Sequence, residues 1–206
     1  QWLDFDRFRR LSAAFSALWL STALALPTPK PAWVKDVKAL GNLAVTDSGD
    51  VTFIGSDAKL HRLNGNGQEL WAVSLGDVGR AQPLLTPQGL TLAAAYDDVL
   101  RAIDASGKTL WSLQLDGDIF ASPALRPDGS VITATSAGSV YAIGSNGQIL
   151  WRRHVGTPIY SSPIIGADGH IYFGTQGNTF MALSESGSPL WRLQTGATVF
   201  SSPAFD

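Results

Sequence analysis

The stretch Val140-Tyr141-Ala142-Ile143-Gly144-Ser145-Asn146-Gly147-Gln148-Ile149-Leu150-Trp151 occurs four times in this chain, with substitutions but without insertions. Its final tryptophan is preceded by leucine in every copy and returns at intervals of 40 residues. The four residues concerned are Trp71, Trp111, Trp151 and Trp191. Self-similarity at a fixed period of this length indicates a repeat architecture, so the chain is organised as 40-residue units.

Each unit divides into four short segments that favour β-strands. In the third unit these segments are Ser122–Leu125, Val131–Thr135, Val140–Ile143 and Ile149–Trp151. The dipeptides Asp128-Gly129 and Asn146-Gly147 lie between segments, and both are signals for a two-residue hairpin with a type I′ turn. Four antiparallel strands in about 40 residues make one blade of a β-propeller. The sequence therefore predicts an all-β fold.

The residues that recur in every unit are expected to be architectural. One indole on the last strand of each blade can pack between adjacent sheets and bury apolar surface there. Glycines at two repeat positions suit turns, and a proline at a third suits the opening of a first strand. These columns are Gly67, Gly107, Gly147 and Gly187; Gly49, Gly89, Gly129 and Gly169; and Pro83, Pro123, Pro163 and Pro203. We therefore interpret Trp71, Trp111, Trp151 and Trp191 as residues that dock one blade on the next.

The strand and turn motifs of the third unit resemble the pyrroloquinoline-quinone-like (PQQ-like) β-propeller repeat. The resemblance rests on Val140-Tyr141-Ala142-Ile143, on Gly147-Gln148-Ile149-Leu150-Trp151 and on the following Ser161-Ser162-Pro163-Ile164. Gly169-His170-Ile171-Tyr172-Phe173-Gly174-Thr175 is similar to a further strand of that family. This resemblance implies a propeller of four-stranded blades over residues 33–206. Members include quinoprotein dehydrogenases, an outer-membrane assembly scaffold and sensor ectodomains.

The repeats do not account for a complete propeller. Members of the family commonly have seven or eight blades, whereas this chain has four full units, and Ser201-Ser202-Pro203 opens another. Trp33 lies 38 residues before Trp71, so its strand fits the pattern if the loop between them is two residues shorter. It could form the outer strand of a closing blade. Because the chain also begins with glutamine, we expect it to be part of a longer protein with an incomplete propeller.

The N-terminal residues resemble a targeting segment. Arg7, Arg9 and Arg10 precede an uncharged stretch of sixteen residues, and Ala23-Leu24-Ala25 offers the small residues of a cleavage site. This pattern predicts a secretory signal peptide over residues 1–26, with an uncleaved signal-anchor as the alternative. The proline-rich residues 27–32 are expected to form a linker. Either reading places the repeats outside the cytoplasm, in the periplasm or the extracellular space.

Composition limits the possible functions. Hydrophobic residues make up 45% of the 206 residues, which allows a sizeable core, and the formal net charge of −2 argues against a basic nucleic-acid binder. The chain has no cysteine, so it has no disulfides, thiolate zinc site or cysteine nucleophile. A membrane partner is expected only through the N-terminal segment, if that segment stays uncleaved.

Few residues offer catalytic chemistry. The resemblance implies that quinoprotein relatives use a vicinal cysteine pair, PQQ, a calcium ion and a catalytic aspartate, and the cysteines are missing here. The carboxylate clusters Asp97-Asp98 and Asp116-Gly117-Asp118 fall at expected turns and offer too few ligands for calcium. The three histidines, His61, His154 and His170, occupy different repeat positions, which predicts no shared metal site. No cofactor and no metal site are therefore evident from the sequence.

One column of variable residues is a candidate binding site. Arg80, Phe120, Tyr160 and Phe200 lie 40 residues apart in the loops that enter the innermost strands. Such loops gather near the axis of a propeller, so these side chains could surround the mouth of the channel. Aromatic residues and arginine are enriched at binding hot spots. The alternative is that the aromatic rings only pack beneath neighbouring loops.

These observations favour an exported, non-catalytic binding or scaffold module whose ligand is a protein, a small molecule or a glycan. One alternative is the propeller of a periplasmic PQQ-dependent oxidoreductase whose active-site residues lie outside this chain. Another is the sensory ectodomain of a membrane protein, which would require the N-terminal segment to remain in the membrane.

Overall fold

The structure is a computed structural model that describes residues 32–204. The chain divides into two compact units, Gln1–Ala32 and Trp33–Asp206, and the fold below is that of the second unit. The predicted signal segment and nearly all of the predicted linker lie outside the described residues. Within the described part of the chain, no helix is long and apolar enough to cross a membrane.

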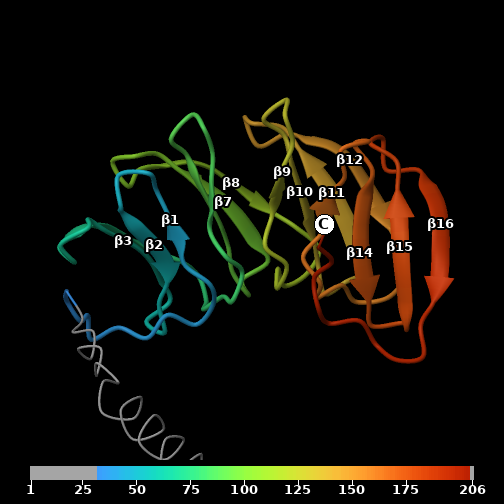
Figure 1. The fold of residues 1–206 in the computed structure, drawn as a ribbon. Helices are drawn as coiled ribbons and strands as arrows, with labels where there is room; N and C mark the ends of the chain where they lie inside the picture. Colours follow the sequence, from blue (N-terminus) through green and yellow to red (C-terminus); the bar gives the residue numbers. More distant parts are fainter. Residues whose placement is uncertain (1–31, 205–206) are drawn as a thin grey trace, which may run out of the picture. The chain divides into compact units, whose positions relative to one another are not determined.

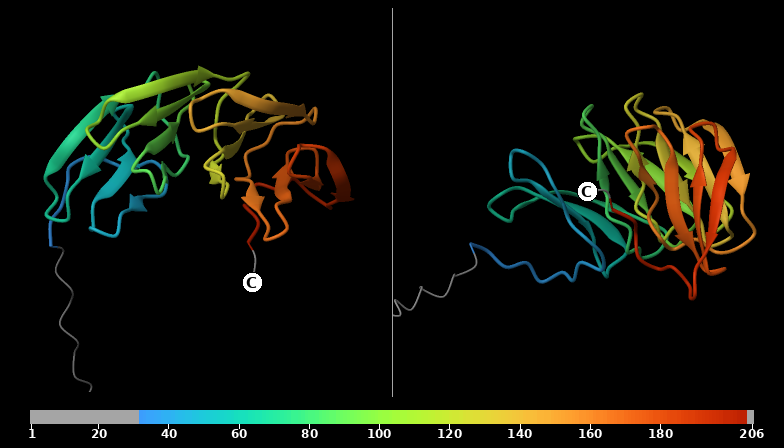
Figure 2. Two further views of the ribbon diagram at one scale, coloured as in Figure 1. Left: turned by 90° about the horizontal axis from the view of Figure 1, so that it is seen from above. Right: turned by 45° about the vertical axis from the view of Figure 1, so that its right-hand side comes forward.

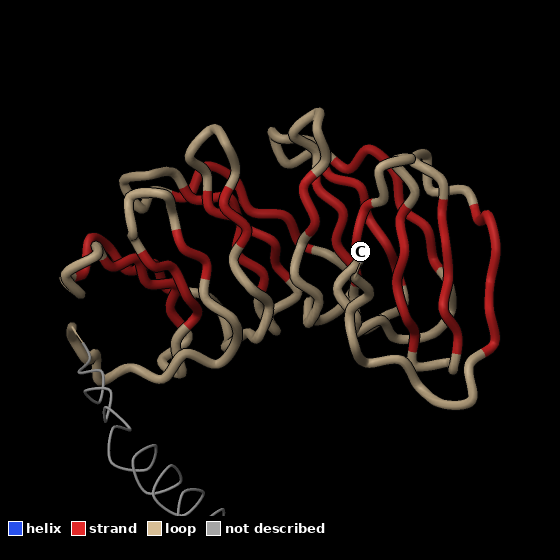
Figure 3. The backbone as a smooth tube through the Cα atoms, in the orientation of Figure 1, coloured by secondary structure: helices blue, strands red, loops and turns tan. Residues whose placement is uncertain are grey.

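The described residues form sixteen β-strands in four antiparallel sheets and contain no helix (Figures 1 and 3). Each sheet takes four strands that are consecutive in the chain, and each strand pairs with its sequence neighbours. Blade 1 contains β1 (Ala44–Val45), β2 (Val51–Ile54), β3 (Lys59–Leu63) and β4 (Glu69–Ser74). Blade 2 contains β5 (Leu84–Leu85), β6 (Thr91–Ala94), β7 (Val99–Ile103) and β8 (Thr109–Gln114). Blade 3 contains β9 (Ala124–Leu125), β10 (Val131–Ala134), β11 (Ser139–Ile143) and β12 (Ile149–His154). Blade 4 contains β13 (Ile164–Ile165), β14 (Ile171–Thr175), β15 (Thr179–Leu183) and β16 (Pro189–Gln194).

The four blades of this unit follow one another around an open arc (Figure 2). The six-residue strand of each blade lies on the outer side of the arc, and the two-residue strand lies on the inner side. The arc is not closed into a ring. The prediction of an all-β fold built from four-stranded propeller blades, forming an incomplete propeller, is thus confirmed.

The hydrophobic core lies between the blades, where apolar faces of neighbouring sheets meet. At the contact between blades 3 and 4, Ile132 and Val140 of blade 3 are fully buried together with Ile171, Phe173 and Leu183 of blade 4. Burying apolar surface of this kind is the main favourable term in folding. We call each such contact between consecutive blades a seam, and every seam combines the same repeat positions.

The tryptophan indoles lie at the seams. The Nε1 of Trp71, Trp111 and Trp151 donates a hydrogen bond of 3.0–3.1 Å to a backbone carbonyl of the next blade, 34 residues later in the chain. Each of these rings also lies against a glycine of the same turn in the next blade, namely Gly107, Gly147 and Gly187 respectively. The indole therefore contributes both apolar burial and one satisfied N–H group to every internal seam.

Trp33 makes the same contact with blade 1 although it lies in no strand. Its Nε1 donates to the Gly65 carbonyl at 3.0 Å, and its ring lies against Gly67. A second contact follows the repeat. The Ser56 N–H donates to the Lys38 carbonyl, and one repeat later the Tyr96 N–H donates to the Val78 carbonyl. Trp33 and Lys38 thus make the contacts that Trp71 and Val78 make one repeat later. The first pair is two residues closer in sequence than the second, so the shortening of the first repeat by two residues falls between Trp33 and Lys38.

The hairpin turns differ in type from the sequence expectation. A type I′ turn needs positive φ at two residues, but in the Asp128-Gly129 turn only Gly129 has it, at +83°. The Arg126 N–H donates to the Ser130 carbonyl and closes a three-residue loop, residues 127–129, between β9 and β10. The Asp128 carboxylate accepts the Ser130 N–H at 2.9 Å. This aspartate stabilises the longer loop from its side chain and does not need a left-handed backbone.

Candidate binding surface

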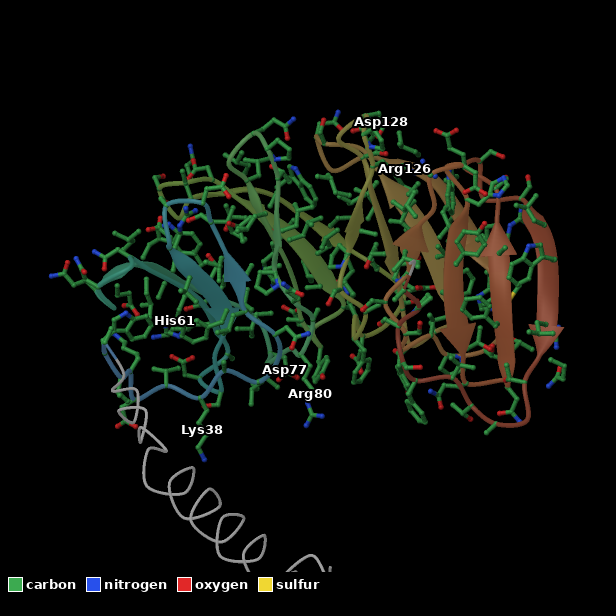
Figure 4. All side chains as sticks on the ribbon, in the orientation of Figure 1. Lys38, His61, Asp77, Arg80, Arg126 and Asp128 are labelled. Carbon is green, nitrogen blue, oxygen red and sulfur yellow. The ribbon has the colours of Figure 1, made fainter. Side chains whose placement is uncertain are left out.

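The loops that join consecutive blades lie at one end of the sheets, together with the β2–β3, β6–β7, β10–β11 and β14–β15 turns. We call this end the loop face. Figure 4 shows Asp77 and Arg80 on it, and Arg126 and Asp128 at the opposite end, which we call the turn face. All four residues of the predicted binding column belong to the loop face.

Three of the four predicted residues form a continuous row of aromatic rings. The ring centroids of Phe120 and Tyr160 are 4.6 Å apart, and those of Tyr160 and Phe200 are 6.1 Å apart. Phe120 and Tyr160 are half-buried, whereas Phe200 is 63% exposed. Because the blades are arranged in an arc, loops that are 40 residues apart in sequence come side by side.

Tyr96 extends this row at its other end. Its ring centroid lies 4.3 Å from that of Phe120, within the range of favourable aromatic pairs. The sequence reasoning missed Tyr96 because it sits in the β6–β7 turn and belongs to a different repeat column. The sequence does single out Tyr96 in one way: it is the only aromatic residue of its repeat column, whose other members are Ser56, Ser136 and Gln176. We call Tyr96, Phe120, Tyr160 and Phe200 the aromatic row.

Arg80, the fourth predicted residue, is exposed and contributes no aromatic ring to this row. It lies close enough to Tyr96 to affect it: burial raises the pKa of the Tyr96 phenol, and the positive charge of Arg80 opposes that rise. The preceding residue explains the difference. Ile119 and Ile159 are fully buried and anchor the loops of Phe120 and Tyr160, whereas Gly79 has no side chain with which to anchor Arg80.

A series of serine hydroxyls links the loops beneath the row. The Gln82 N–H donates to the Ser122 hydroxyl at 2.8 Å, the Ser122 N–H to Ser162 at 2.9 Å, and the Ser162 N–H to Ser202 at 3.0 Å. Each bond joins one repeat position to the same position of the next blade. The loops that carry the aromatic row are therefore held at a fixed spacing.

The carboxylates at the loop face are engaged by other side chains. Asp97 forms an ion pair with Arg101 and also accepts the Gly76 N–H at 2.8 Å. Asp98 interacts with Asp118; burial, a hydrogen bond to Asp118 and the charge of Asp118 raise the pKa of Asp98.

A further group of polar residues superficially resembles a hydrolytic triad. Ser139 Oγ lies 2.6 Å from Asp116 Oδ2 and 3.3 Å from His154 Nδ1, and Arg152 also contacts both Ser139 and Asp116. In a triad the histidine lies between the acid and the serine, but here the serine is in the middle. Ser139 is also fully buried. This group therefore stabilises the structure of blade 3 and presents no nucleophile.

The residues present do not fit a calcium site of the quinoprotein type. Asp97, Asp98, Asp116 and Asp118 are engaged as described, and the described residues hold no group of three or more histidine, aspartate or glutamate side chains arranged for a metal ion. Coordination of Ca²⁺ takes six to eight oxygen ligands.

His61 is held by two carboxylates within blade 1. Its Nε2 lies 3.0 Å from Asp57 Oδ1 and its Nδ1 lies 2.9 Å from Glu69 Oε2. Burial would raise the pKa of Asp57, but the hydrogen bond and charge of His61 outweigh it and lower that pKa. These contacts link the β2–β3 turn, strand β3 and strand β4 within blade 1.

The fold and its loop face define an incomplete β-propeller of the PQQ-like repeat type, with a row of aromatic rings on that face. The family model described as outer membrane protein assembly factor BamB matches residues 19–164 and 97–206. The chain belongs to this family.

Two known proteins illustrate its similarities. The crystal structure of BamB from Moraxella catarrhalis superposes with a TM-score of 0.72 at 16% identity, over 82% of this chain and 56% of that one. A desiccation/radiation resistance protein of Deinococcus radiodurans is 49% identical over 68 residues, which are 33% of this chain and 12% of that protein. The chain thus spans about an eighth of that relative and about half of the solved propeller.

Proposed function

We propose that this chain is a non-catalytic scaffold module of the cell envelope that docks protein segments on the aromatic row. Membership in the outer membrane protein assembly factor family supports an envelope scaffold and protein partners. The observation that carries the proposal is the unbroken contact from Tyr96 through Phe120 and Tyr160 to Phe200. An export signal in residues 1–26 would deliver the blades to the periplasm.

The row suits an extended peptide with alternating apolar and polar residues. Three of its rings, those of Phe120, Tyr160 and Phe200, come from successive loops at a fixed spacing, and rigid aromatic side chains lose little entropy when they bind. Outer-membrane strands of about ten residues have this alternation. Such a segment, before it inserts, could place its apolar side chains on the row and its polar side chains in solvent. Arg80 lies at the edge of this surface and could pair with an acidic residue of the segment.

The test measures binding of a fluorescein-labelled ten-residue peptide that alternates phenylalanine or tyrosine with serine or threonine. Fluorescence polarisation is compared for the full chain and for Phe200→Ala, Tyr160→Ala and Phe120→Ala. Because hot-spot truncations cost more than about 1 kcal/mol, each variant should weaken binding on the order of tenfold. Phe200 is the most informative position, since its exposure makes a stability effect small.

Two controls distinguish docking on the aromatic row from non-specific binding of the peptide. Leu110→Ala removes a side chain that is 50% exposed on the outer strand β8, far from the loop face, and should leave binding unchanged. A peptide of identical composition without the alternation should bind more weakly. Equal binding by the parent chain and all three aromatic variants, with intact circular dichroism spectra, would refute the proposal.

A further inference from the structure

Three ionisable side chains, those of Arg126, His170 and Glu185, belong to one place on the turn face, at the seam between blades 3 and 4. These repeat positions vary along the chain. The equivalent residues are Thr46, Leu90 and Ala105 at the seam between blades 1 and 2, and Thr86, Ser130 and Ser145 at the seam between blades 2 and 3. Only the seam between blades 3 and 4 therefore carries ionisable groups at all three positions.

Arg126 is built into this seam and is not a surface side chain. It is 7% exposed, and its guanidinium lies over the Trp151 ring at 5.7 Å from the centroid. One terminal nitrogen donates to the Glu185 carbonyl, which also accepts the Trp151 Nε1 at 3.1 Å. The Nε of Arg126 is buried without a hydrogen-bond partner among the described residues. Leaving a donor of a buried cation unpaired is costly, so the packing of this seam alone does not explain the position of Arg126.

Three adjoining hollows share Arg126 in their linings. Their volumes are about 390, 500 and 310 Å³. The largest is lined also by Leu150, Trp151, His170 and Glu185, and the second by Asp128 and Glu185. The first two lie along the seam between blades 3 and 4 and form a shallow, extended depression, which we call the seam groove. The third is lined also by Pro87 and Gln88 of blade 2.

The seam groove mixes donors, acceptors and apolar surface. Arg126 donates, the Glu185 carboxylate accepts, and the His170 Nδ1 is paired with Asp168 at 2.7 Å. Leu150 is 47% exposed and adds apolar area. The positive charge of Arg126 is offset by carboxylates, so the groove is not a simple anion or cation site. Hydroxyl groups both donate and accept, and sugar rings carry an apolar face, so this lining matches a neutral polyhydroxylated ligand.

We propose that the seam groove between blades 3 and 4 is a binding site for a neutral oligosaccharide, with Arg126 and Glu185 as its hydrogen-bonding residues. The site lies on the turn face, at the opposite end of the blades from the aromatic row (Figure 4). It does not depend on the docking function proposed above.

The test uses maltotetraose, cellotetraose and chitotetraose as probes for the full chain, with isothermal titration calorimetry and tryptophan fluorescence as readouts. The variant Arg126→Thr/His170→Ser/Glu185→Ser gives this seam the residues of earlier repeats, so the fold should be retained. Binding of at least one tetrasaccharide by the parent chain, weakened on the order of tenfold or more in the variant, is expected.

The matched control makes a change at the equivalent seam, where Thr86→Ser should leave saccharide binding intact. Binding of the same tetrasaccharide with equal affinity by the reverted variant would overturn the proposal. So would failure of all three probes to bind the parent chain. Competition by inorganic phosphate with no saccharide binding would show an anion site instead and would equally refute it.

Discussion

Replacing Gly147 by alanine tests the seam between blades 2 and 3 at a single atom. Gly147 has φ of +85°, and an added Cβ would lie 2.8 Å from Cδ2 and 3.0 Å from Cε3 of Trp111. Gly129 is a matched control, since its φ is +83° but its Cβ would meet nothing within 4 Å. Both alanines incur the left-handed backbone cost of about 1–2 kcal/mol. Only Gly147→Ala must also displace a tryptophan, which adds about 1–3 kcal/mol of overpacking.

Urea unfolding measures this difference as a shift in midpoint at equal slope. We expect Gly147→Ala to be less stable than Gly129→Ala by that overpacking cost. In a Trp111→Ala background the ring is absent, so the two alanines should cost the same. Equal destabilisation by the two single variants would mean that the indole does not pack on the turn, and it would refute the account of the seams.

Three further outcomes are expected. Trp71→Phe loses the indole bond to Ala105 and should destabilise by about 1 kcal/mol in urea, whereas Trp191→Phe, which makes no such bond among residues 32–204, should cost less. Burial would raise the pKa of Asp116, but its hydrogen bonds and a nearby positive charge lower that pKa below 3.8. The ionised carboxylate therefore stabilises the folded state above that value, and this stabilisation is lost as the pH falls. Thermal unfolding of Asp116→Asn should accordingly depend less on acid than that of the parent chain. The pKa of Asp98 is raised in the folded state. The protonated carboxyl therefore stabilises the folded state below pH 3.8, and this stabilisation is lost as the pH rises through the pKa of the folded state. In the same assay, Asp98→Asn should not show this loss of stability.

The fold could be predicted from the sequence because the information was repeated four times. A tryptophan and two glycines in one phase identify a unit, and turn signals inside it divide the unit into strands. The strand limits were less accurate. β12 continues from Trp151 to His154, because an exposed outer strand accepts charged side chains, and β9 has only two residues. Local composition does not reveal where pairing to a neighbour stops.

The candidate surface could be predicted only in part. Column spacing identified Phe120 and Tyr160 because equal positions in successive blades come together in space. Tyr96 reaches the same row from a turn, which depends on the path of the backbone and not on the repeat period. Arg80 shares the column but lies exposed, since the glycine before it cannot anchor its loop. Arg126 has no periodic signal at all, and its burial follows from the close approach of blade 4.

The serine series has a consequence for cooperativity. Each of its bonds joins only adjacent blades, and the indole bonds of the seams also reach no farther than the next blade. Coupling between nearest neighbours makes the unit behave as a one-dimensional array, in which stability is a sum of blade and interface contributions. Opening should then begin at the terminal blade, whose outer strand β16 is exposed along its whole length. Amide hydrogen exchange should accordingly be fastest in blade 4 and slowest in blades 2 and 3, which have a neighbouring blade on both sides.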